Sequence, residues 1–194
     1  MVQSLNFNKI LFYLIVANSF FSPSLSLAET LFEGYSLILT GKARAGFVVQ
    51  NYSVDQKAKV YTSTYYIKTN ALGGDMTESL SAKCNMEFEP ISYKYTSIVN
   101  KKAKTIDATF KGSKEKGYKM KAVISENGQP GNPISLDLPK ETILSTFLAY
   151  WMLAKGVSVS KPPFNYNAVA EEAAKVFTGV AKVQKVLKVN NIDS

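Results

Sequence analysis

From Gly34 onward the chain consists of short segments in which apolar and polar residues alternate, and turn residues separate these segments. A period of two predicts strands with one face toward a core and the other toward water. Their close spacing along the chain indicates an antiparallel meander. The expected strands are Gly34–Thr40, Phe47–Val54, Ala58–Thr69, Met76–Cys84, Ile91–Val99, Thr105–Phe110 and Tyr118–Ser125.

The period changes after the loop Asn127–Pro133. The segment Ile143–Ala154 contains only two polar residues, Ser145 and Thr146, and predicts a helix that is apolar on nearly all sides. At about 1.5 Å per residue it is about 18 Å long, too short for a bilayer core of about 30 Å. Such a helix needs cover on more than one side. The predicted fold class is therefore mainly β: a curved antiparallel meander, or half-open barrel, wrapped around one buried apolar helix.

Residues 166–189 fit two patterns. Apolar residues three and four apart would form the apolar stripe of a helix, whereas the density of β-branched residues and the interruption at Gly179 favour strands. We favour strands, with the helix as the alternative. Asn190 and Asn191 predict a turn into a further strand at Ile192–Ser194. The chain would then end on an unpaired sheet edge, which a partner or a second copy would close.

The first 28 residues have the pattern of an export signal. Lys9 precedes the apolar run Ile10–Ala17, Pro23 follows, and small residues lie before the junction of Ala28 and Glu29. The run is too short to span a bilayer. We therefore expect a signal peptide at 1–28, cleaved between Ala28 and Glu29, and a single β-rich domain at 29–194. The expected location is the periplasm or the medium, without a transmembrane helix or a lipid anchor.

The charge of the chain is basic but poor in arginine. Cleavage would remove one basic residue and no acid, so the net charge of +8 would become +7. Arg44 is the only arginine, and readers of nucleic acid rely on the arginine fork, so we expect no nucleic-acid partner. One predicted hairpin carries a lysine cluster, which is either a solvated hairpin or a peripheral contact with an anionic membrane or an acidic partner. The cluster is Lys111, Lys114, Lys116, Lys119 and Lys121.

The residue types exclude several kinds of catalysis. The chain has no histidine, which removes Ser-His-Asp and Cys-His catalysis and most zinc sites. Cys84 is the only cysteine, so no intrachain disulfide forms, and burial as a small apolar residue is its expected role. Glu171 and Glu172 are adjacent and cannot face one substrate together, so surface charge is expected of them. We expect no enzyme, no cofactor and no metal site.

Aromatic residues supply the candidate ligand contacts. Tyrosine in a strand and aromatic residues on an apolar helix line a cavity in some proteins and fill the core in others. The candidates are Phe147, Tyr150 and Trp151 of the predicted helix and Tyr61, Tyr65, Tyr93 and Tyr95 of predicted strands.

Three parts of the chain together resemble an uncharacterised domain family of exported bacterial proteins, whose members also occur beside transglutaminase-like domains. These parts are the strands from Leu31 to Phe110, the segment Leu138-Pro139 with Ser145–Leu148, and the segment Tyr166 to Gly179 with Ala170–Glu172. The plan is similar to the half-barrel of periplasmic lipoprotein carriers. The resemblance implies an envelope location and apolar-ligand binding. It supports the strand interpretation of the tail and supplies no catalytic residues.

Two functions fit these observations. The first is an exported periplasmic, non-catalytic binding module that holds a lipid or another apolar ligand between the curved sheet and the apolar helix. The second is a structural or protein-interaction domain of the cell envelope without a small ligand. A cavity of about 300 Å³ or more would favour the first, because ligand pockets start near that size.

Overall fold

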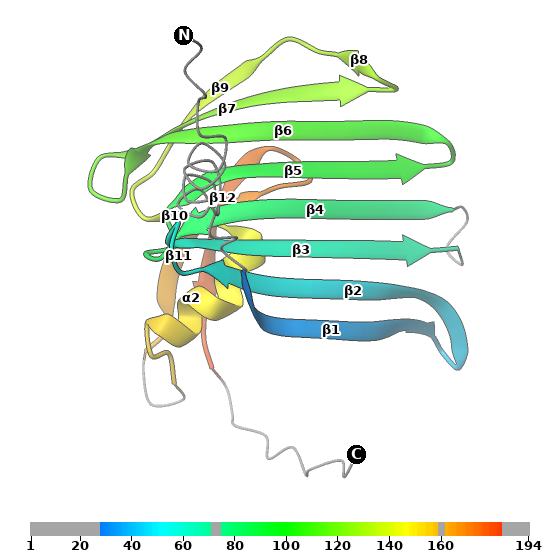
Figure 1. Cartoon of the computed structure of the whole chain (residues 1–194), viewed down its shortest axis with the longest axis horizontal. Helices are drawn as coiled ribbons and strands as arrows, with labels where there is room; N and C mark the ends of the chain where they lie inside the picture. Colours follow the sequence, from blue (N-terminus) through cyan, green and yellow to red (C-terminus); the bar gives the residue numbers. More distant parts are fainter. Residues whose placement is uncertain (1–27, 71–74, 159–161, 184–194) are drawn as a thin grey trace, which may run out of the picture.

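The alternating segments form the long strands of one antiparallel sheet, as the period of two predicts. The computed structural model of the protein describes residues 28–70, 75–158 and 162–183. Seven strands each pair antiparallel with the next one in sequence (Figure 1). They are β1 (Glu29–Thr40), β2 (Ala43–Asp55), β3 (Val60–Thr69), β4 (Met76–Asn85), β5 (Pro90–Val99), β6 (Lys102–Ser113) and β7 (Gly117–Glu126).

Two short strands complete the nine-stranded sheet. β8 (Gln129–Pro130) and β9 (Ile134–Leu138) both pair with β7. The sequence prediction treats the chain around β8 as a loop and omits β9, which has only five residues and lies between Pro133 and Pro139. Pairing with β7 supplies the hydrogen bonds that so short a segment cannot provide by itself.

One face of the sheet is the core face. In β4, Leu80, Ala82 and Cys84 are buried, whereas Ser81 and Lys83 between them are exposed. The same alternation runs through the neighbouring strands, because register pairing aligns buried residues such as Leu80 with others such as Tyr95. We call this face the inner face and the opposite one the outer face. The predicted burial of Cys84 is confirmed.

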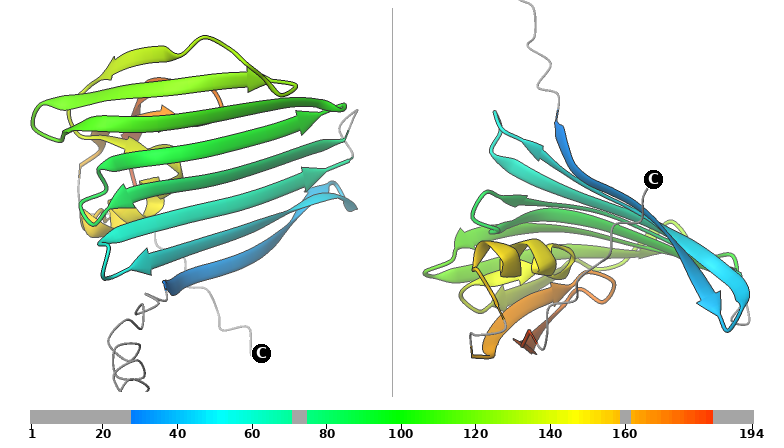
Figure 2. Two further views of the ribbon diagram at one scale, coloured as in Figure 1. Left: turned by 45° about the horizontal axis from the view of Figure 1, so that its top comes forward. Right: turned by 90° about the horizontal axis from the view of Figure 1, so that it is seen from below.

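A small second layer covers one end of the inner face (Figures 1 and 2). It consists of a strand β10 (Thr142–Leu144), a 3-10 turn η1 (Ser145–Phe147), the helix α2 (Leu148–Ala154), and the strands β11 (Phe164–Ala170) and β12 (Lys175–Ala181). β10 pairs parallel with β11, which pairs antiparallel with β12. The predicted mainly β class and the meander are confirmed, and the sheet stays open between its edges as a half-barrel.

The helix is shorter and less enclosed than predicted. The α-helix begins only at Leu148, and Ile143 and Leu144 are buried strand residues opposite Ala168 and Val169. Trp151 is buried in α2, but Leu153 on another side is 73% exposed. The nine-stranded sheet contacts α2 through Tyr52 and Tyr150. β11 contacts it through the rings of Phe164 and Tyr166 around Trp151. The apolar run therefore combines a strand that is buried on both faces with a helix that has one uncovered side.

The tail forms strands as far as the structure describes it. β11 and β12 confirm the favoured interpretation, and Gly179 lies in β12 because the ring of Tyr166 occupies the space that a side chain would need there. The predicted turn at Asn190 and Asn191, the strand after it, and all of the predicted signal peptide except Ala28 lie outside the described residues.

Gly112 allows the β6–β7 hairpin to close. Its φ is +138°, and an added Cβ would lie 2.2 Å from the carbonyl oxygen of Gly117. We expect Gly112→Ala to lower the free energy of unfolding by about 2 kcal/mol, because both the backbone and the neighbouring strand must shift. Urea unfolding monitored by Trp151 fluorescence measures this change.

Gly128 provides the matched control. Its φ is also positive, at +81°, but an added Cβ would meet no atom within 4 Å. Gly128→Ala should therefore cost only the left-handed backbone strain, about 1 kcal/mol. Equal losses for the two variants would show that contact with Gly117 is not what makes Gly112 necessary.

Candidate functional site

An apolar pocket of about 320 Å³ lies where α2 approaches the sheet. The walls come from α2 and η1, from the neighbouring parts of β1, β2 and β3, and from the turn between β4 and β5. Apolar side chains dominate the lining, and Ser53 and Thr62 add polar atoms. The apolar lining residues are Leu31, Tyr52, Tyr61, Met86, Phe88, Phe147, Tyr150, Leu153 and Ala154.

Tyr52 of β2 connects the sheet to the second layer at this pocket. Its ring centroid lies 4.5 Å from that of Tyr150 and 6.1 Å from that of Phe147. Its hydroxyl donates to the carbonyl oxygen of Thr146 at 2.7 Å and accepts from the side-chain amide of Gln50 at 2.6 Å. Because these two bonds satisfy the hydroxyl, Tyr52 adds an aromatic wall without an unpaired polar group.

A stacked aromatic pair forms the opposite wall. The rings of Tyr61 on β3 and Phe88 in the β4–β5 turn lie 5.4 Å apart with an interplanar angle of 22°. Phe88 has a φ of +63°, a conformation that a bulky residue rarely adopts. The Asn85 side chain stabilises this turn by accepting from the backbone N–H groups of Glu87 and Glu89, both at 2.9 Å. The turn thus directs Phe88 toward α2.

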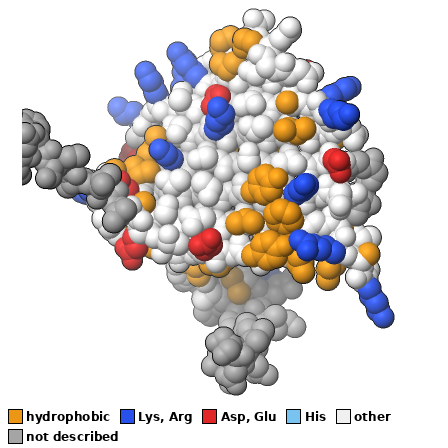
Figure 3. Space-filling view, turned by 45° about the vertical axis from the view of Figure 1, so that its right-hand side comes forward, with side chains coloured by type: hydrophobic (Ala, Val, Ile, Leu, Met, Phe, Trp, Pro, Cys, Tyr) orange, Lys and Arg blue, Asp and Glu red, His pale blue; other side chains and the backbone are white. Residues whose placement is uncertain are grey.

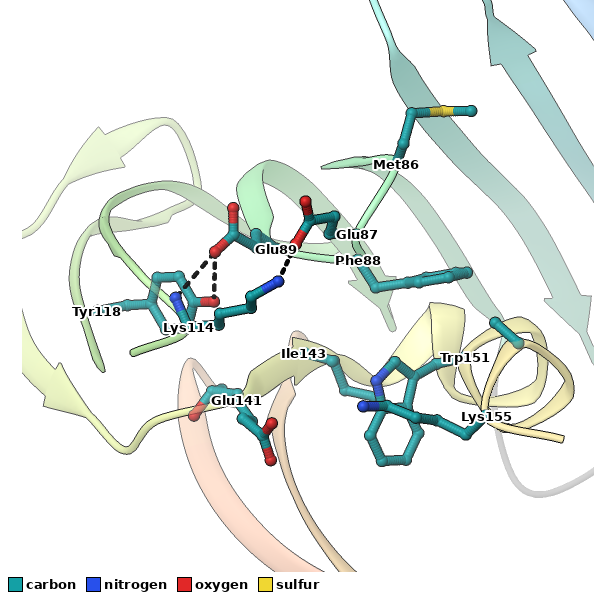
Figure 4. A pocket seen from close by; sticks show the side chains of 12 residues that line it. Met86, Glu87, Phe88, Glu89, Lys114, Tyr118, Glu141, Ile143, Trp151 and Lys155 are labelled. Carbon is teal, nitrogen blue, oxygen red and sulfur yellow. Dashed lines mark hydrogen bonds and ion pairs between the residues drawn. The ribbon is translucent and has the colours of Figure 1, made fainter. Parts of the chain in front are cut away.

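A second pocket, of about 300 Å³, shares the lining residues Met86, Phe88 and Ala154 with the first. We call it the charged pocket. Figure 4 shows Glu87, Glu89, Lys114 and Tyr118 on one side of it and Glu141, Ile143, Trp151 and Lys155 on the other. An apolar pocket and a charged pocket therefore lie next to each other, with Phe88 common to both.

Glu89 organises the charged pocket. Its carboxylate accepts from the Asn85 amide at 2.7 Å, from the backbone N–H of Lys114 at 2.8 Å and from the Tyr118 hydroxyl at 3.4 Å. The Lys114 ammonium donates to Glu87, which raises the pKa of that lysine. The β4–β5 turn is thereby joined to the β6–β7 hairpin beside the pocket mouth.

The structure separates the predicted ligand-lining residues. Phe147, Tyr150 and Tyr61 line the apolar pocket, and Trp151 lines the charged one. Tyr65 packs against the sheet core and lines neither pocket. Tyr93 and Tyr95 are buried in that core and also line neither, although Tyr93 borders a separate hollow on the sheet beside Ala108 and Ala122.

These two core tyrosines differ in their hydrogen bonding. The Tyr95 hydroxyl donates to Glu78 at 2.9 Å, and burial together with this bond raises the pKa of Tyr95 to about 12. Within the described part of the chain, the buried Tyr93 hydroxyl has no hydrogen-bond partner.

Residues that the sequence did not indicate complete the apolar pocket. Met86 and Phe88 lie in a turn, where periodicity carries no signal, and Leu31 lies before the first predicted strand. Leu153 belongs to the predicted helix, but nothing in the sequence marks it as facing a pocket. Tyr52 stands at an alternating position of a predicted strand, which indicates a core face and not a cavity.

Glu171 corrects the expectation of surface charge. Its side chain is 3% exposed, although Glu172 next to it is exposed as predicted. Ser145 Oγ donates to Glu171 Oε2 at 2.5 Å, and the Thr146 N–H donates to Oε1 at 3.2 Å. Burial raises the pKa of Glu171, and Glu172 adds to this, while the two hydrogen bonds oppose it. Glu171 thus holds η1 against the β11–β12 turn.

The lysine cluster is divided among several environments. Lys114 pairs with Glu87, and Lys119 lies 3.6 Å from Asp137. Lys111, Lys119 and Lys121 alternate with inner-face residues and project from the outer face, where they are exposed. Contact of this surface with an anionic membrane or an acidic partner stays a prediction.

Comparisons add no assignment to this geometry: no family model, curated protein or solved structure matches the chain. Within the described residues, no group of three acids or cysteines is arranged to hold a metal ion. In the same part of the chain, no helix has the length and apolar character needed to cross a membrane.

Proposed function

We propose that the protein is an exported, non-catalytic binding module that holds an apolar group, such as the acyl chain of a lipid, in the apolar pocket. The observation that carries the proposal is a cavity of about 320 Å³ with nine apolar lining residues between α2 and the sheet. This volume lies within the range of small-molecule sites, which are mostly apolar. Export to the periplasm or the medium is inferred from residues 1–28.

The polar groups near the pocket favour an apolar ligand. The Tyr52 hydroxyl is already hydrogen-bonded to Thr146 and Gln50, so Tyr52 contacts a ligand mainly through its aromatic ring. Burial raises the pKa of Tyr150, so this residue stays neutral at the pocket wall. A ligand with a polar end is expected to place that end in the adjacent charged pocket, past Phe88. The proposed ligand is therefore an amphiphile with one slender apolar chain.

Native mass spectrometry of the protein purified from its own host tests the proposal. The expected result is a bound species with the mass of a lipid or fatty acid, released by organic solvent. Dodecanoate added to the delipidated protein should then bind with 1:1 stoichiometry by calorimetry. A protein that carries no ligand and does not bind dodecanoate would contradict the proposal.

A substitution at Ala154 should block the apolar pocket. Ala154 is exposed at the end of α2 and lines both pockets. Ala154→Trp should weaken dodecanoate binding at least tenfold, because the indole fills space that the acyl chain of dodecanoate would occupy. A tenfold loss of affinity corresponds to about 1.4 kcal/mol. Calorimetric titration measures the dissociation constant.

Ala149→Trp is the control for this substitution. Ala149 is also exposed on α2 but does not line the apolar pocket. The Ala149→Trp variant should bind dodecanoate with the same dissociation constant as the unmodified protein. Equal weakening in both variants would locate the effect in the helix as a whole and count against the pocket.

An interaction domain of the envelope is the second candidate function. The observation that favours it is the exposed apolar edge strand β1, with Tyr35 and Leu39 each more than half exposed. A protein that lacks a ligand but associates through β1 would fit this second function.

A further inference from the structure

The two edges of the nine-stranded sheet are protected to different degrees. At one edge, β8 has only two residues, one of them Pro130, and β9 is five residues long. At the other edge, β1 runs for twelve residues and, within the described part of the chain, pairs only with β2. Proteins protect an edge strand with lysine, proline or short length, because a free edge pairs with other strands. β1 is long and has no lysine or proline, and its one bulge, at Leu31, lies near its start.

Large apolar side chains are exposed along β1. Each is at least 43% exposed, and together they extend over most of the strand: Leu31, Phe32, Tyr35, Leu37 and Leu39. Such a concentration on a single strand marks an interaction surface.

The apolar surface continues onto the outer face. Phe47 of β2 stacks on Tyr35 at 5.7 Å, and Tyr66 of β3 lies 5.9 Å from Phe47. Arg44 donates to the Tyr35 hydroxyl at 2.7 Å and lies over the Phe47 ring. Figure 3 shows hydrophobic side chains gathered on the part of the surface toward β1–β3, with basic side chains beside them. The row of rings is therefore fixed in place beside the free edge.

The sequence of β1 is close to a palindrome about Tyr35. Residues at equal distance from Tyr35 match in size and polarity at every step except Glu33 and Leu37. The matching pairs are Gly34 with Ser36, Phe32 with Ile38, Leu31 with Leu39, and Thr30 with Thr40. When two such strands pair antiparallel about a two-fold axis at Tyr35, the residues from Phe32 to Ile38 meet their matches in the other copy, except that Glu33 meets Leu37. The bulge at Leu31 lies outside this central stretch.

The charges around β1 suit the same pairing. Glu29 and Glu33 lie in the first half of the strand, and Lys42 follows its end. A two-fold axis at Tyr35 places the start of β1 at Glu29 in one copy beside the turn at Gly41 and Lys42 in the other. Like charges are kept apart, and the acidic beginning of each strand meets the basic turn of the other.

We propose that β1 is the interface of a homodimer, in which two copies pair their β1 strands antiparallel about Tyr35 and form one continuous sheet. A strand of another protein would also find a free edge at β1, but it would make no use of the palindrome. The second copy is therefore the occupant that the sequence of β1 fits best. Leu31 is the only β1 residue that also lines the apolar pocket, and the pairing about Tyr35 does not depend on it, so either proposal can fail without the other.

Light scattering coupled to size exclusion tests the dimer. The purified protein should have the mass of two chains at micromolar concentration. Tyr35→Lys should weaken the dimer at least tenfold, because two lysines would meet on the axis. Ile98→Lys is the matched control, since Ile98 is 44% exposed on β5, away from β1, and this variant should remain a dimer.

Cysteine cross-linking tests the register. Under mild oxidation, Tyr35→Cys should form a covalent dimer, since residue 35 faces itself across the axis. Leu37→Cys alone should not form a covalent dimer, because residue 37 faces residue 33 of the other copy. The double variant Glu33→Cys with Leu37→Cys should form one. Cys84 is fully buried and can stay in place. A monomeric protein, a dimer that Tyr35→Lys leaves intact, or equal cross-linking at 35 and 37 would each overturn the proposal.

Discussion

Replacing Phe147 with alanine is expected to lower the free energy of unfolding by about 3–5 kcal/mol. Phe147 is 2% exposed and belongs to the main core cluster between the sheet and the second layer. Its removal would take away the ring next to Tyr52 and leave a cavity that the neighbouring strands cannot close. This loss is a large share of the total stability of a domain of this size. Urea unfolding monitored by far-UV circular dichroism measures it.

Leu153→Ala is the control for this substitution. Leu153 is on the same helical segment and also lines the apolar pocket, but it is 73% exposed. Its loss should change the free energy of unfolding by no more than about 0.5 kcal/mol. Similar effects for the two variants would mean that the second layer does not pack on the sheet through Phe147.

Replacing Glu171 with alanine is expected to cost about 2–3 kcal/mol. The substitution would leave the Thr146 N–H and the Ser145 hydroxyl without the carboxylate that accepts from them. Glu171→Gln keeps the shape: its amide oxygen can accept from the Thr146 N–H and its NH2 can donate to Ser145 Oγ, so at pH 4 it should retain most of the stability. Urea unfolding of the two variants and the unmodified protein at one pH measures the difference.

The pH dependence of Glu171 gives the same residue a second test. Burial raises its pKa in the folded protein above the value of about 4.3 that an unfolded glutamate has. The folded state therefore binds the proton more tightly than the unfolded state does. The contribution of Glu171 to stability is complete below about pH 4.3 and is lost as the pH rises through the folded pKa.

Glu171→Gln isolates this contribution from all other titrating groups. The variant and the unmodified protein should have similar stabilities at pH 4, and the variant should gain relative to the unmodified protein as the pH rises to 8. Unfolding curves at both pH values measure the two differences. A difference that does not change with pH, or that moves the other way, would contradict the raised pKa of Glu171.

The sequence predicted the sheet because the alternation of apolar and polar residues is a local property of a strand with one buried face. The bounds of β4 (Met76–Asn85) and β5 (Pro90–Val99) follow the predicted segments to within one residue. The segment Ile143–Ala154 was less informative. A short apolar run looks the same in a strand buried on both faces and in a buried helix, and only the pairing of Ile143 with Ala168 distinguishes them.

The candidate site was predictable only in part. Phe147 and Tyr150 could be proposed because an apolar helix needs a covering surface and aromatic residues fill it. Phe88 could not, since its direction depends on a turn with positive φ that the Asn85 side chain stabilises. Glu171 could not be distinguished from Glu172 in the sequence, because Ser145 lies 26 residues away and meets it only in the fold.

The sequence by itself determined the meander, the inner and outer faces of its strands, the burial of Cys84 and the near-palindrome of β1. These are consequences of residue order over a few positions, through the two-residue period of a strand. The tertiary structure decided where α2 begins, which aromatic rings enclose a cavity, which of two adjacent glutamates is buried and which sheet edge is left free. Each of these depends on side chains or strands that are distant in the sequence, and their meeting is set by how the second layer packs on the curved sheet.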